Sequence, residues 1–154
     1  MDTKNDTNGT FIRNAEVSDC SQIAEILKKD LGYECTDELV RSRLSKLDPR
    51  REAVFAAVRD GEVVGVIHIE RYELLYSDTL ANVLGLAVSG KFRRMGIGRS
   101  LMQAAEKWAE SIGASAVRLN SGAVRKEAHK FYRATGFSSE KEQIRFMKNL
   151  KKVE

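Results

Sequence analysis

The chain has 154 residues, 42% of them hydrophobic, and its 26 basic and 22 acidic residues give a formal net charge of +4. This length is enough for one domain with a buried core and too short for two ordinary domains. The modest charge fits an anionic ligand better than a nucleic acid, whose binding proteins carry a longer basic stripe with interleaved aromatic residues. No apolar run approaches the roughly 20 residues of a membrane helix, so we expect neither nucleic-acid nor membrane binding.

The few cysteines and histidines narrow the chemistry further. Cys20 and Cys35 form no CxxC pair, and no secretory apolar segment opens the chain, so we expect a reducing cytoplasm. His68 and His129 are the only histidines, and their spacing from the cysteines is not that of metal ligands, so no metal is expected. A cysteine–histidine nucleophile pair stays open, but neither cysteine stands at a strand-to-helix elbow, which favours packing roles.

The first third of the chain predicts one strand and two helices. Residues 1–9 are polar and lack an apolar anchor, as is typical of a disordered tail. Residues 10–14 are predicted to form a short strand. Ser18 is the predicted cap of a helix that ends at Gly32, and a second helix begins near Thr36 and stops before the only proline.

The rest of the chain predicts a hairpin and then alternating strands and helices. Strands at 54–59 and 63–72 flank Asp60-Gly61, a pair that suits the positive φ angles of a type I′ turn. A strand, a helix, a strand, a helix ending at Gly136 and an antiparallel strand pair then follow in order, at residues 80–88, 101–112, 116–120, 124–136, and 137–139 with 143–150.

This order of elements predicts the fold class. The strand–helix–strand segment in the middle favours a parallel pair there, whereas the hairpins favour antiparallel pairing elsewhere. We therefore expect a single α/β domain over residues 10–154, with four helices and a mixed central sheet of about six to seven strands.

The segment from Lys91 to Ser100 carries the sharpest functional signal. It places two glycines and four cations before a helix, and no Asp or Glu occurs from Thr79 through Ala105. A helix N-terminus exposes unpaired N–H groups and the positive end of the helix dipole, so cations gather there when a polyanion such as a pyrophosphate binds. A plain turn with solvated arginines is the alternative. Arg99 excludes the Walker phosphate loop, and Leu101 excludes the dinucleotide fingerprint.

Two motifs here are similar to those of a known family. Arg93-Arg94-Met95-Gly96-Ile97-Gly98, preceded by Leu86-Ala87-Val88, resembles the acyl-CoA signature of the GNAT superfamily of N-acetyltransferases. The run from Ala128 to Phe137, with Phe131-Tyr132 and Gly136-Phe137, resembles the same superfamily's second block. The resemblance covers about residues 10–150. It implies a sheet whose fourth and fifth strands splay apart, with acetyl-CoA as acyl donor in the gap.

The resemblance also assigns cofactor contacts. The backbone of the fourth strand would bind the pantetheine arm, and the amides of the glycine turn would bind the pyrophosphate. Arg125 stands where many members have an asparagine that contacts the cofactor. The implied cofactor-binding residues are Leu86, Ala87, Val88, Arg93, Arg94, Met95, Gly96, Ile97, Gly98, Arg99, Ser100 and Arg125.

The implied reaction is direct acetyl transfer in a ternary complex, without an acyl-enzyme. Tyr132 matches the family's general acid, which protonates the leaving thiolate. Many members use an acidic residue of the fourth strand as a base, whereas this chain has Asn82, Leu84 and Gly85 there. Glu70, on one strand face with His68 and Tyr72, and Glu73 are the remaining candidates for a general base acting through water.

The acceptor is less defined. Asp30, Glu34, Asp37 and Glu38 cluster at the junction of the first two helices, and such an acidic rim favours a cationic small-molecule or peptide amine. An acyl-CoA-binding sensor or partner subunit without transferase activity is the alternative function. The final strands leave a homodimer open.

Overall fold

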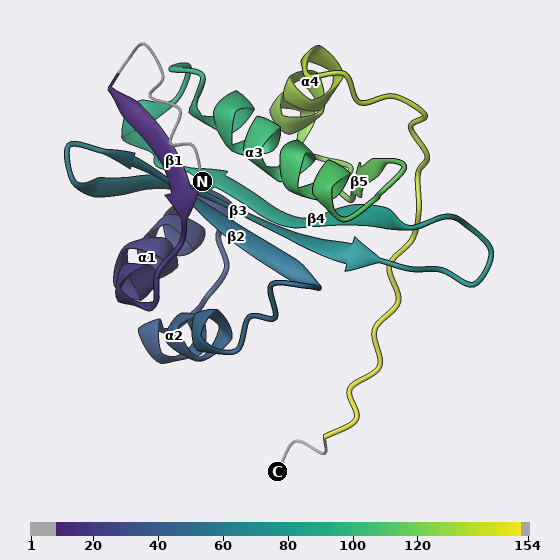
Figure 1. Cartoon of the computed structure of the whole chain (residues 1–154), viewed down its shortest axis with the longest axis horizontal. Coiled ribbons are helices and arrows are strands. Elements are labelled where there is room, and N and C mark those ends of the chain that lie inside the picture. Colours follow the sequence, from purple (N-terminus) through teal and green to yellow (C-terminus); the bar gives the residue numbers. More distant parts are fainter. Residues whose placement is uncertain (1–8, 152–154) are drawn as a thin grey trace. The chain divides into compact units, whose positions relative to one another are not determined.

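The computed structural model describes residues 9–151, so the predicted disordered tail lies, except for Gly9, outside the described residues. The described part of the chain divides after Asn120 into two compact units, residues 9–120 and 121–151. The first unit holds one five-stranded sheet in the order β1-β2-β3-β4-β5 (Figure 1). Its strands are β1 Thr10–Asn14, β2 Glu52–Arg59, β3 Glu62–Tyr72, β4 Leu80–Val88 and β5 Val117–Leu119. Its α-helices are α1 Cys20–Leu31, α2 Asp37–Ser45 and α3 Ile97–Ser111, with short 3-10 turns at Val17–Asp19 and Gly90–Phe92.

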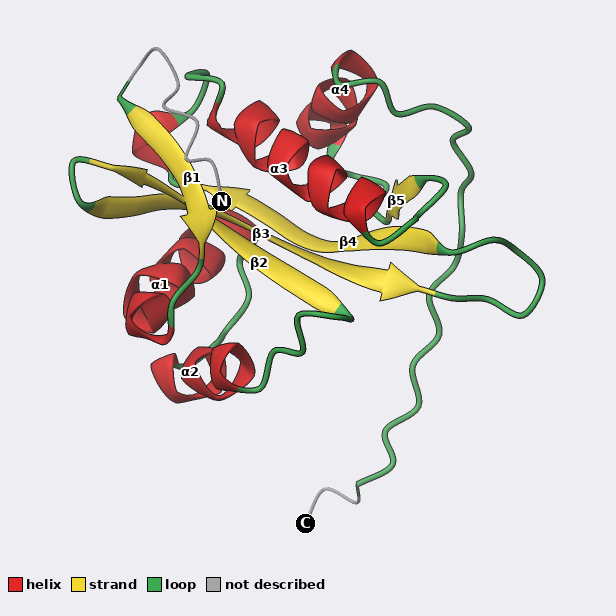
Figure 2. Ribbon diagram, viewed as in Figure 1, coloured by secondary structure: helices red, strands yellow, loops and turns green. Residues whose placement is uncertain are grey.

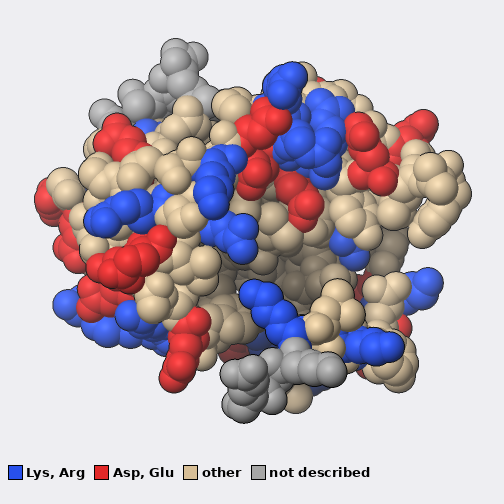
Figure 3. All heavy atoms as spheres, turned by 90° about the horizontal axis from the view of Figure 1, so that it is seen from below, with Lys and Arg blue, Asp and Glu red and all other residues tan. Residues whose placement is uncertain are grey.

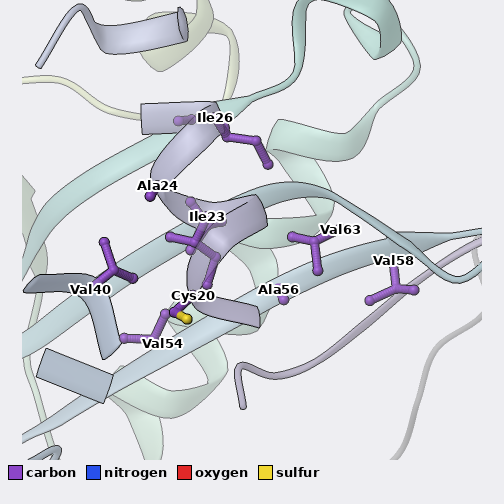
Figure 4. Close-up of a cluster of buried hydrophobic side chains, with 11 residues drawn as sticks. Cys20, Ile23, Ala24, Ile26, Val40, Val54, Ala56, Val58 and Val63 are labelled. Atoms are coloured by element: carbon purple, nitrogen blue, oxygen red, sulfur yellow. The ribbon is translucent and has the colours of Figure 1, made fainter. Parts of the chain in front are cut away.

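Helices cover both faces of this sheet. In Figures 1 and 2, α1 and α2 lie on one face and α3 on the other. The face under α1 packs Cys20 and Ile23 against Val54 and Ala56 of β2 (Figure 4). Burying a side chain of the size of Ile23 contributes about 1.5–3 kcal/mol. Because β2 and β3 are covered on both faces, their sequences read as nearly continuous apolar runs rather than as alternating patterns.

The β4–β5 pair is parallel and short. Strands β1 to β4 form an antiparallel meander, whereas β5 pairs with β4 only from Ala81↔Val117 to Val83↔Leu119. Strand β4 continues to Val88, so five of its residues extend beyond its ladder with β5. The predicted splay of these two strands is therefore confirmed.

Local turn and cap chemistry agrees with the sequence at most boundaries. Thr36 caps α2 by accepting a hydrogen bond from the Leu39 N–H (3.1 Å), and Asp60 and Gly61 adopt the positive φ angles of the hairpin turn. The predicted Ser18 cap is wrong. Asp19 instead accepts a hydrogen bond from the Glu16 N–H (2.7 Å), which closes a capping box on the 3-10 turn before α1.

The second unit contains α4, Lys126–Ala134, as its one helix among residues 121–151. The predicted final strand pair is wrong, because residues 137–151 form no strand in the described structure. Four apolar side chains of that segment are exposed, namely Ile144, Phe146, Met147 and Leu150. The alternation of apolar and polar residues that predicted the second strand breaks after Phe146. A strand also needs a partner to pair its backbone N–H and C=O groups, and the alternation alone does not supply one. The described sheet therefore has five strands rather than six to seven, while the four helices and the mixed α/β class are confirmed.

A membrane span is not found among the helices within residues 9–151, since none is both long and apolar enough to cross a bilayer.

The buried pair Arg13–Asp19 provides a stability test. The Arg13 guanidinium donates to Asp19 at 2.7 and 3.0 Å and, as the largest cause, lowers the pKa of that carboxyl, with the Glu16 N–H adding to the effect and burial opposing it. Replacing Asp19 by Asn should lower the free energy of unfolding at neutral pH by about 2 kcal/mol, measured by urea denaturation. Glu25→Gln, which removes an exposed pair with Lys29, is the control and should leave stability unchanged.

The pH dependence of this difference has a definite sign. Because the pKa of Asp19 is lower in the folded chain, its contribution is complete above the ordinary value of 3.8 and is lost as the pH falls through the folded-state pKa. The stability gap between the wild type and Asp19→Asn should therefore shrink only below about pH 4. A gap that is constant down to acid pH would contradict the assignment.

Candidate active site

The glycine-containing loop ends at the first turn of α3. Gly96 is the N-cap of this helix with φ +77°, and Arg94 also has a positive φ of 64°. The first intrahelical hydrogen bond runs from the Ser100 N–H to the Gly96 carbonyl (3.0 Å). The N–H groups of Ile97, Gly98 and Arg99 precede that bond, so helix geometry provides no acceptor for them. The helix begins at Ile97 rather than at Leu101 as predicted, which places Gly98 inside its first turn.

Close packing fixes this first turn on the sheet. Ile97 and Leu101 are buried, and both face Gly65 of β3. A Cβ on Gly65 would come within 3.0 Å of Leu101 Cδ1 and 3.1 Å of Ile97 Cγ2. The missing side chain therefore lets the helix start approach β3 closely. In this arrangement the Ile97 side chain belongs to the core, and only its backbone is left for a ligand.

One of the four cations of the loop is paired with an acid. The Arg93 guanidinium donates to the Asp30 carboxylate on α1, whose side chain is only 11% exposed. Lys91, Arg94 and Arg99 form no ion pair within residues 9–151. Arg94 and Arg99 therefore remain as cations without an ion pair around the start of the helix, while the charge of Lys91 acts on Glu25 of α1.

Other charges on the molecule are mixed. On the face shown in Figure 3, lysines and arginines are interspersed with acidic residues rather than gathered in one stripe.

Asp30 also contacts the end of β4. Its Oδ2 accepts a hydrogen bond from the Val88 N–H (3.3 Å). The Ser89 N–H donates to Val64 of β3 (2.8 Å), so by strand alternation the backbone groups of Leu86 and Val88 face the edge without a strand partner. Asp30 accepts the hydrogen bond of the Val88 N–H. Among the three residues predicted to contact the pantetheine arm, this leaves Leu86 as the one whose backbone groups on this edge have no partner. Asp30 is thus a tie between α1, β4 and the loop rather than part of an acidic rim.

The other three acids of the predicted rim differ in exposure and in hydrogen bonding. Glu34 and Glu38 are exposed, whereas Asp37 accepts a hydrogen bond from Ser21 Oγ (2.7 Å). A hollow of about 650 Å³ lies at this helix junction, and of the four predicted acids only Glu34 lines it. The lining residues are Lys28, Gly32, Tyr33, Glu34, Cys35, Thr36 and Leu39.

A row of polar side chains crosses four strands on the α1/α2 face of the sheet. Glu52, Glu70, Asn82 and Arg118 are in register from β2 to β5. Asn82 donates to Glu70 (3.1 Å) and accepts from Arg118 (2.7 Å). The Arg118 guanidinium lies 4.7 Å from the ring centroid of Tyr72. Asn82 therefore links Glu70 to Arg118 by hydrogen bonds.

Of two residues near Glu70 in the sequence, His68 lies beside this row of polar side chains and Glu73 does not. His68 lies one step along the same strand face, and its Nε2 is 2.8 Å from Glu52 Oε1. Glu73, the other predicted base, lies beyond the end of β3 and pairs with Arg71 at 3.2 Å. This places it away from the row.

The second unit carries Tyr132, Arg125 and His129. Burial raises the pKa of Tyr132, and the charge of Arg125 partly offsets the rise. The Tyr132 ring stacks edge to face with Phe131 and Phe137, at centroid distances of 5.4 and 5.7 Å. The phenol is therefore protonated at neutral pH. His129 Nε2 lies 2.9 Å from the Gly122 carbonyl, which is a structural role.

The cysteines have packing roles. Cys20 lies in the core, and Cys35 Sγ lies 3.5 Å from the Ala24 carbonyl. Within residues 9–151, no group of three or more His, Cys, Asp and Glu side chains is placed to hold a metal ion.

Sequence reasoning missed the contacts Asp30–Arg93 and Glu52–His68. Asp30 is 63 positions from Arg93 in the chain, and His68 is 16 from Glu52. The predicted hairpin was the one feature of the sequence that pointed to the Glu52–His68 contact, because its register aligns β2 with β3. No local pattern in the sequence pointed to the first.

The tie made by Asp30 predicts a specific loss in Asp30→Ala. Because Arg93 is 64% exposed, its ion pair is screened, and most of the loss should come from the Val88 N–H left without an acceptor, about 1–2 kcal/mol. Urea denaturation measures the loss, and the Val88 amide should exchange faster. Asp37→Ala, which breaks a surface hydrogen bond, is the matched control. Equal stability of the two variants would contradict the tie.

Comparison with known proteins places this geometry in a family. The profile of the acetyltransferase (GNAT) family matches residues 20–137. The aminoalkylphosphonate N-acetyltransferase of Salmonella typhimurium is 32% identical over 129 residues, which are 83% of this chain and 80% of that protein. An aminoglycoside acetyltransferase from an uncultured soil metagenomic sample, solved with trehalose, has a TM-score of 0.77 at 25% identity and covers 94% of this chain and 99% of its own.

A third similar protein was solved with a cofactor analogue. AAC(6')-Iy, in complex with a CoA bisubstrate analogue, shares the fold with a TM-score of 0.79 at 18% identity, over 91% of this chain and 98% of its own. The chain therefore belongs to the GNAT family and is an N-acetyltransferase.

Proposed function

We propose that the chain transfers an acetyl group from acetyl-CoA to a primary amine by direct attack within a ternary complex. The observation that carries this proposal is the start of α3. There the amides of Ile97, Gly98 and Arg99, which have no acceptor within the helix, lie in the same loop and first turn as Arg94 and Arg99, two cations without an ion pair among the described residues. This is the chemistry that binds a diphosphate. The AAC(6')-Iy complex with a CoA bisubstrate analogue supports the same donor in this fold.

The pantetheine arm would follow the open edge of β4. Leu86 offers a backbone donor and acceptor on that edge, as an added strand would require. The arm would then lead from the loop at Gly96 toward the point at which β4 parts from β5. Arg94 and Arg99 would neutralise the phosphates, and Met95 and Ser100 border the same turn.

The reaction then needs two proton transfers. The amine nitrogen attacks the thioester carbonyl, the new C–N bond forms, and the C–S bond breaks. Tyr132 is the proposed donor of the proton that the departing thiolate takes up, and its raised pKa keeps the phenol protonated until then. Backbone N–H groups would stabilise the oxyanion, while most of the rate gain would come from holding the two substrates together.

The acceptor that fits best is a small cationic amine. Glu52 and Glu70 face one another across β2 and β3 and would attract an ammonium group. The similar proteins named above act on aminoalkylphosphonates or aminoglycosides, which are small amines. A screen of such amines, with peptide amines included, identifies the acceptor by release of free CoA thiol.

An acyl-CoA sensor is the second candidate. It is favoured by one observation, which is that β4 (Leu80–Val88) carries no acidic side chain that could serve as a base. Such a protein would bind CoA without releasing thiol with any amine.

Substitution of Gly98 separates ligand binding from folding. Its backbone φ is not in the left-handed region, so Gly98→Ala should keep or slightly raise the melting temperature. The added methyl group would stand between the amides and the phosphate oxygens, and CoA binding should weaken at least about tenfold, or 1.4 kcal/mol, in calorimetry. Glu110→Ala, at the exposed far end of α3, is the control. Unchanged affinity in Gly98→Ala would contradict a diphosphate at this turn.

Removing the phenol hydroxyl tests the general acid. Tyr132→Phe should bind CoA as the wild type does and lower kcat by about 100-fold, because the thiolate then leaves without a proton donor. Tyr76→Phe, at an exposed position, controls for loss of a tyrosine hydroxyl. Equal kcat values in Tyr132→Phe and the wild type would remove the role.

A further inference from the structure

His68 lies at the point where β4 changes its register. It opposes Gly85 across the β3–β4 ladder, and the register shifts between His68 and Ile69. A Cβ on Gly85 would meet no described atom within 4 Å. Because residues opposed in a ladder share a face, this free space adjoins the imidazole. The His68 side chain is 34% exposed, so it is not sealed in the core.

Glu52 determines which nitrogen of His68 is basic. Its Oε1 lies 2.8 Å from Nε2. A carboxylate only accepts hydrogen bonds, so Nε2 carries the proton and Nδ1 keeps its lone pair. The second nitrogen is therefore available as a proton acceptor, with Glu52 holding the ring and stabilising the imidazolium that would form.

The proposed path of acetyl-CoA leads to the same place. A ligand whose diphosphate sits at Gly96 and whose arm follows β4 passes Leu86 and then reaches Gly85. Adjacent strands lie about 4.8 Å apart, so His68 on β3 is about two strand spacings from an arm on the free edge of β4, with Gly85 between them. Strand β5 has left the ladder by Val83, which leaves the edge open for the reacting groups.

We propose that His68, oriented by Glu52, removes the proton from the acceptor amine during acetyl transfer. This proposal rests on the function proposed above and names the base of that reaction. His68 Nδ1 takes one proton from the ammonium group, and the free amine then forms the bond to the carbonyl carbon. The C–S bond breaks, and the thiolate takes a proton from Tyr132. The tyrosinate regains a proton from the newly acylated nitrogen, and the imidazolium returns its proton to solvent.

Glu70 and Glu73 are poorer bases in this structure. Glu70 is already engaged as the acceptor of a hydrogen bond from Asn82. His68 uses Nε2 for its hydrogen bond to Glu52, which leaves Nδ1 for the amine. Glu73 lies five residues beyond His68, or about 16 Å along an extended chain. In this scheme Glu70 attracts the ammonium group and His68 deprotonates it.

The test compares two nucleophiles in the full chain with acetyl-CoA. One is the best aminoglycoside or aminoalkylphosphonate of the screen, which carries an ammonium group. The other is hydroxylamine, which is unprotonated at neutral pH. His68→Ala should lower kcat for the ammonium acceptor by at least about 100-fold with KM for acetyl-CoA unchanged, and it should lower the hydroxylamine rate far less.

Added imidazole should restore the His68→Ala rate and should not restore that of Glu70→Ala. Glu52→Gln, which keeps an acceptor for Nε2 but removes the charge, should lower kcat without changing KM for acetyl-CoA, and imidazole should not rescue it. These results together support His68 as the base and Glu52 as its positioning residue.

Two outcomes would overturn the proposal while leaving the proposed function intact. One is an active His68→Ala with unchanged kcat. The other is a His68→Ala variant whose rates with the ammonium acceptor and with hydroxylamine fall equally and do not rise with added imidazole, which indicates a structural role. A wild type that binds CoA and releases no thiol with any amine would overturn the proposed function itself, and the role of His68 with it.

Discussion

The unpaired edge of β4 is the constraint on which the site depends. A buried backbone N–H or carbonyl without a partner costs free energy, so a parallel pair normally continues along the whole strand. Here the pairing stops at Val83 and Leu119, whereas β4 runs on to Val88. A ligand that adds its own amides to that edge would remove the cost, as the proposed pantetheine contact at Leu86 does.

The first turn of α3, where we propose that the diphosphate binds, is held by packing rather than by its own charges. Gly65 lets Ile97 and Leu101 approach β3, which seats the first turn of α3 on the sheet. Asp30 joins α1 to Arg93 and to the Val88 N–H. These contacts set the direction of the free amides before any ligand arrives, so little ordering is left to be done on binding. Arg93, the first residue of the signature, serves the loop's position in this structure.

Local patterns in the sequence predicted local structure well. Strand β4 was predicted with its observed bounds, because its apolar run is bounded by polar turns. Thr36 and Asp60-Gly61 were predicted from side-chain and backbone preferences that act within four residues. The start of α3 was placed four residues late, because Ile97 belongs to the helical apolar stripe and the glycines around it suggested a turn. The strand pair predicted for residues 137–150 failed because alternation alone does not supply a partner.

The contacts between distant segments could not be predicted in this way. The ties Asp30–Arg93 and Glu52–His68 depend on which helix crosses which strand end and on strand register.

The most direct test of the central claim is hydrogen exchange of individual amides with and without saturating CoA. The account predicts slower exchange at Leu86, Ile97, Gly98 and Arg99, with amides in β1 unchanged. Binding of CoA without protection of these four amides, or no binding at all, would contradict it.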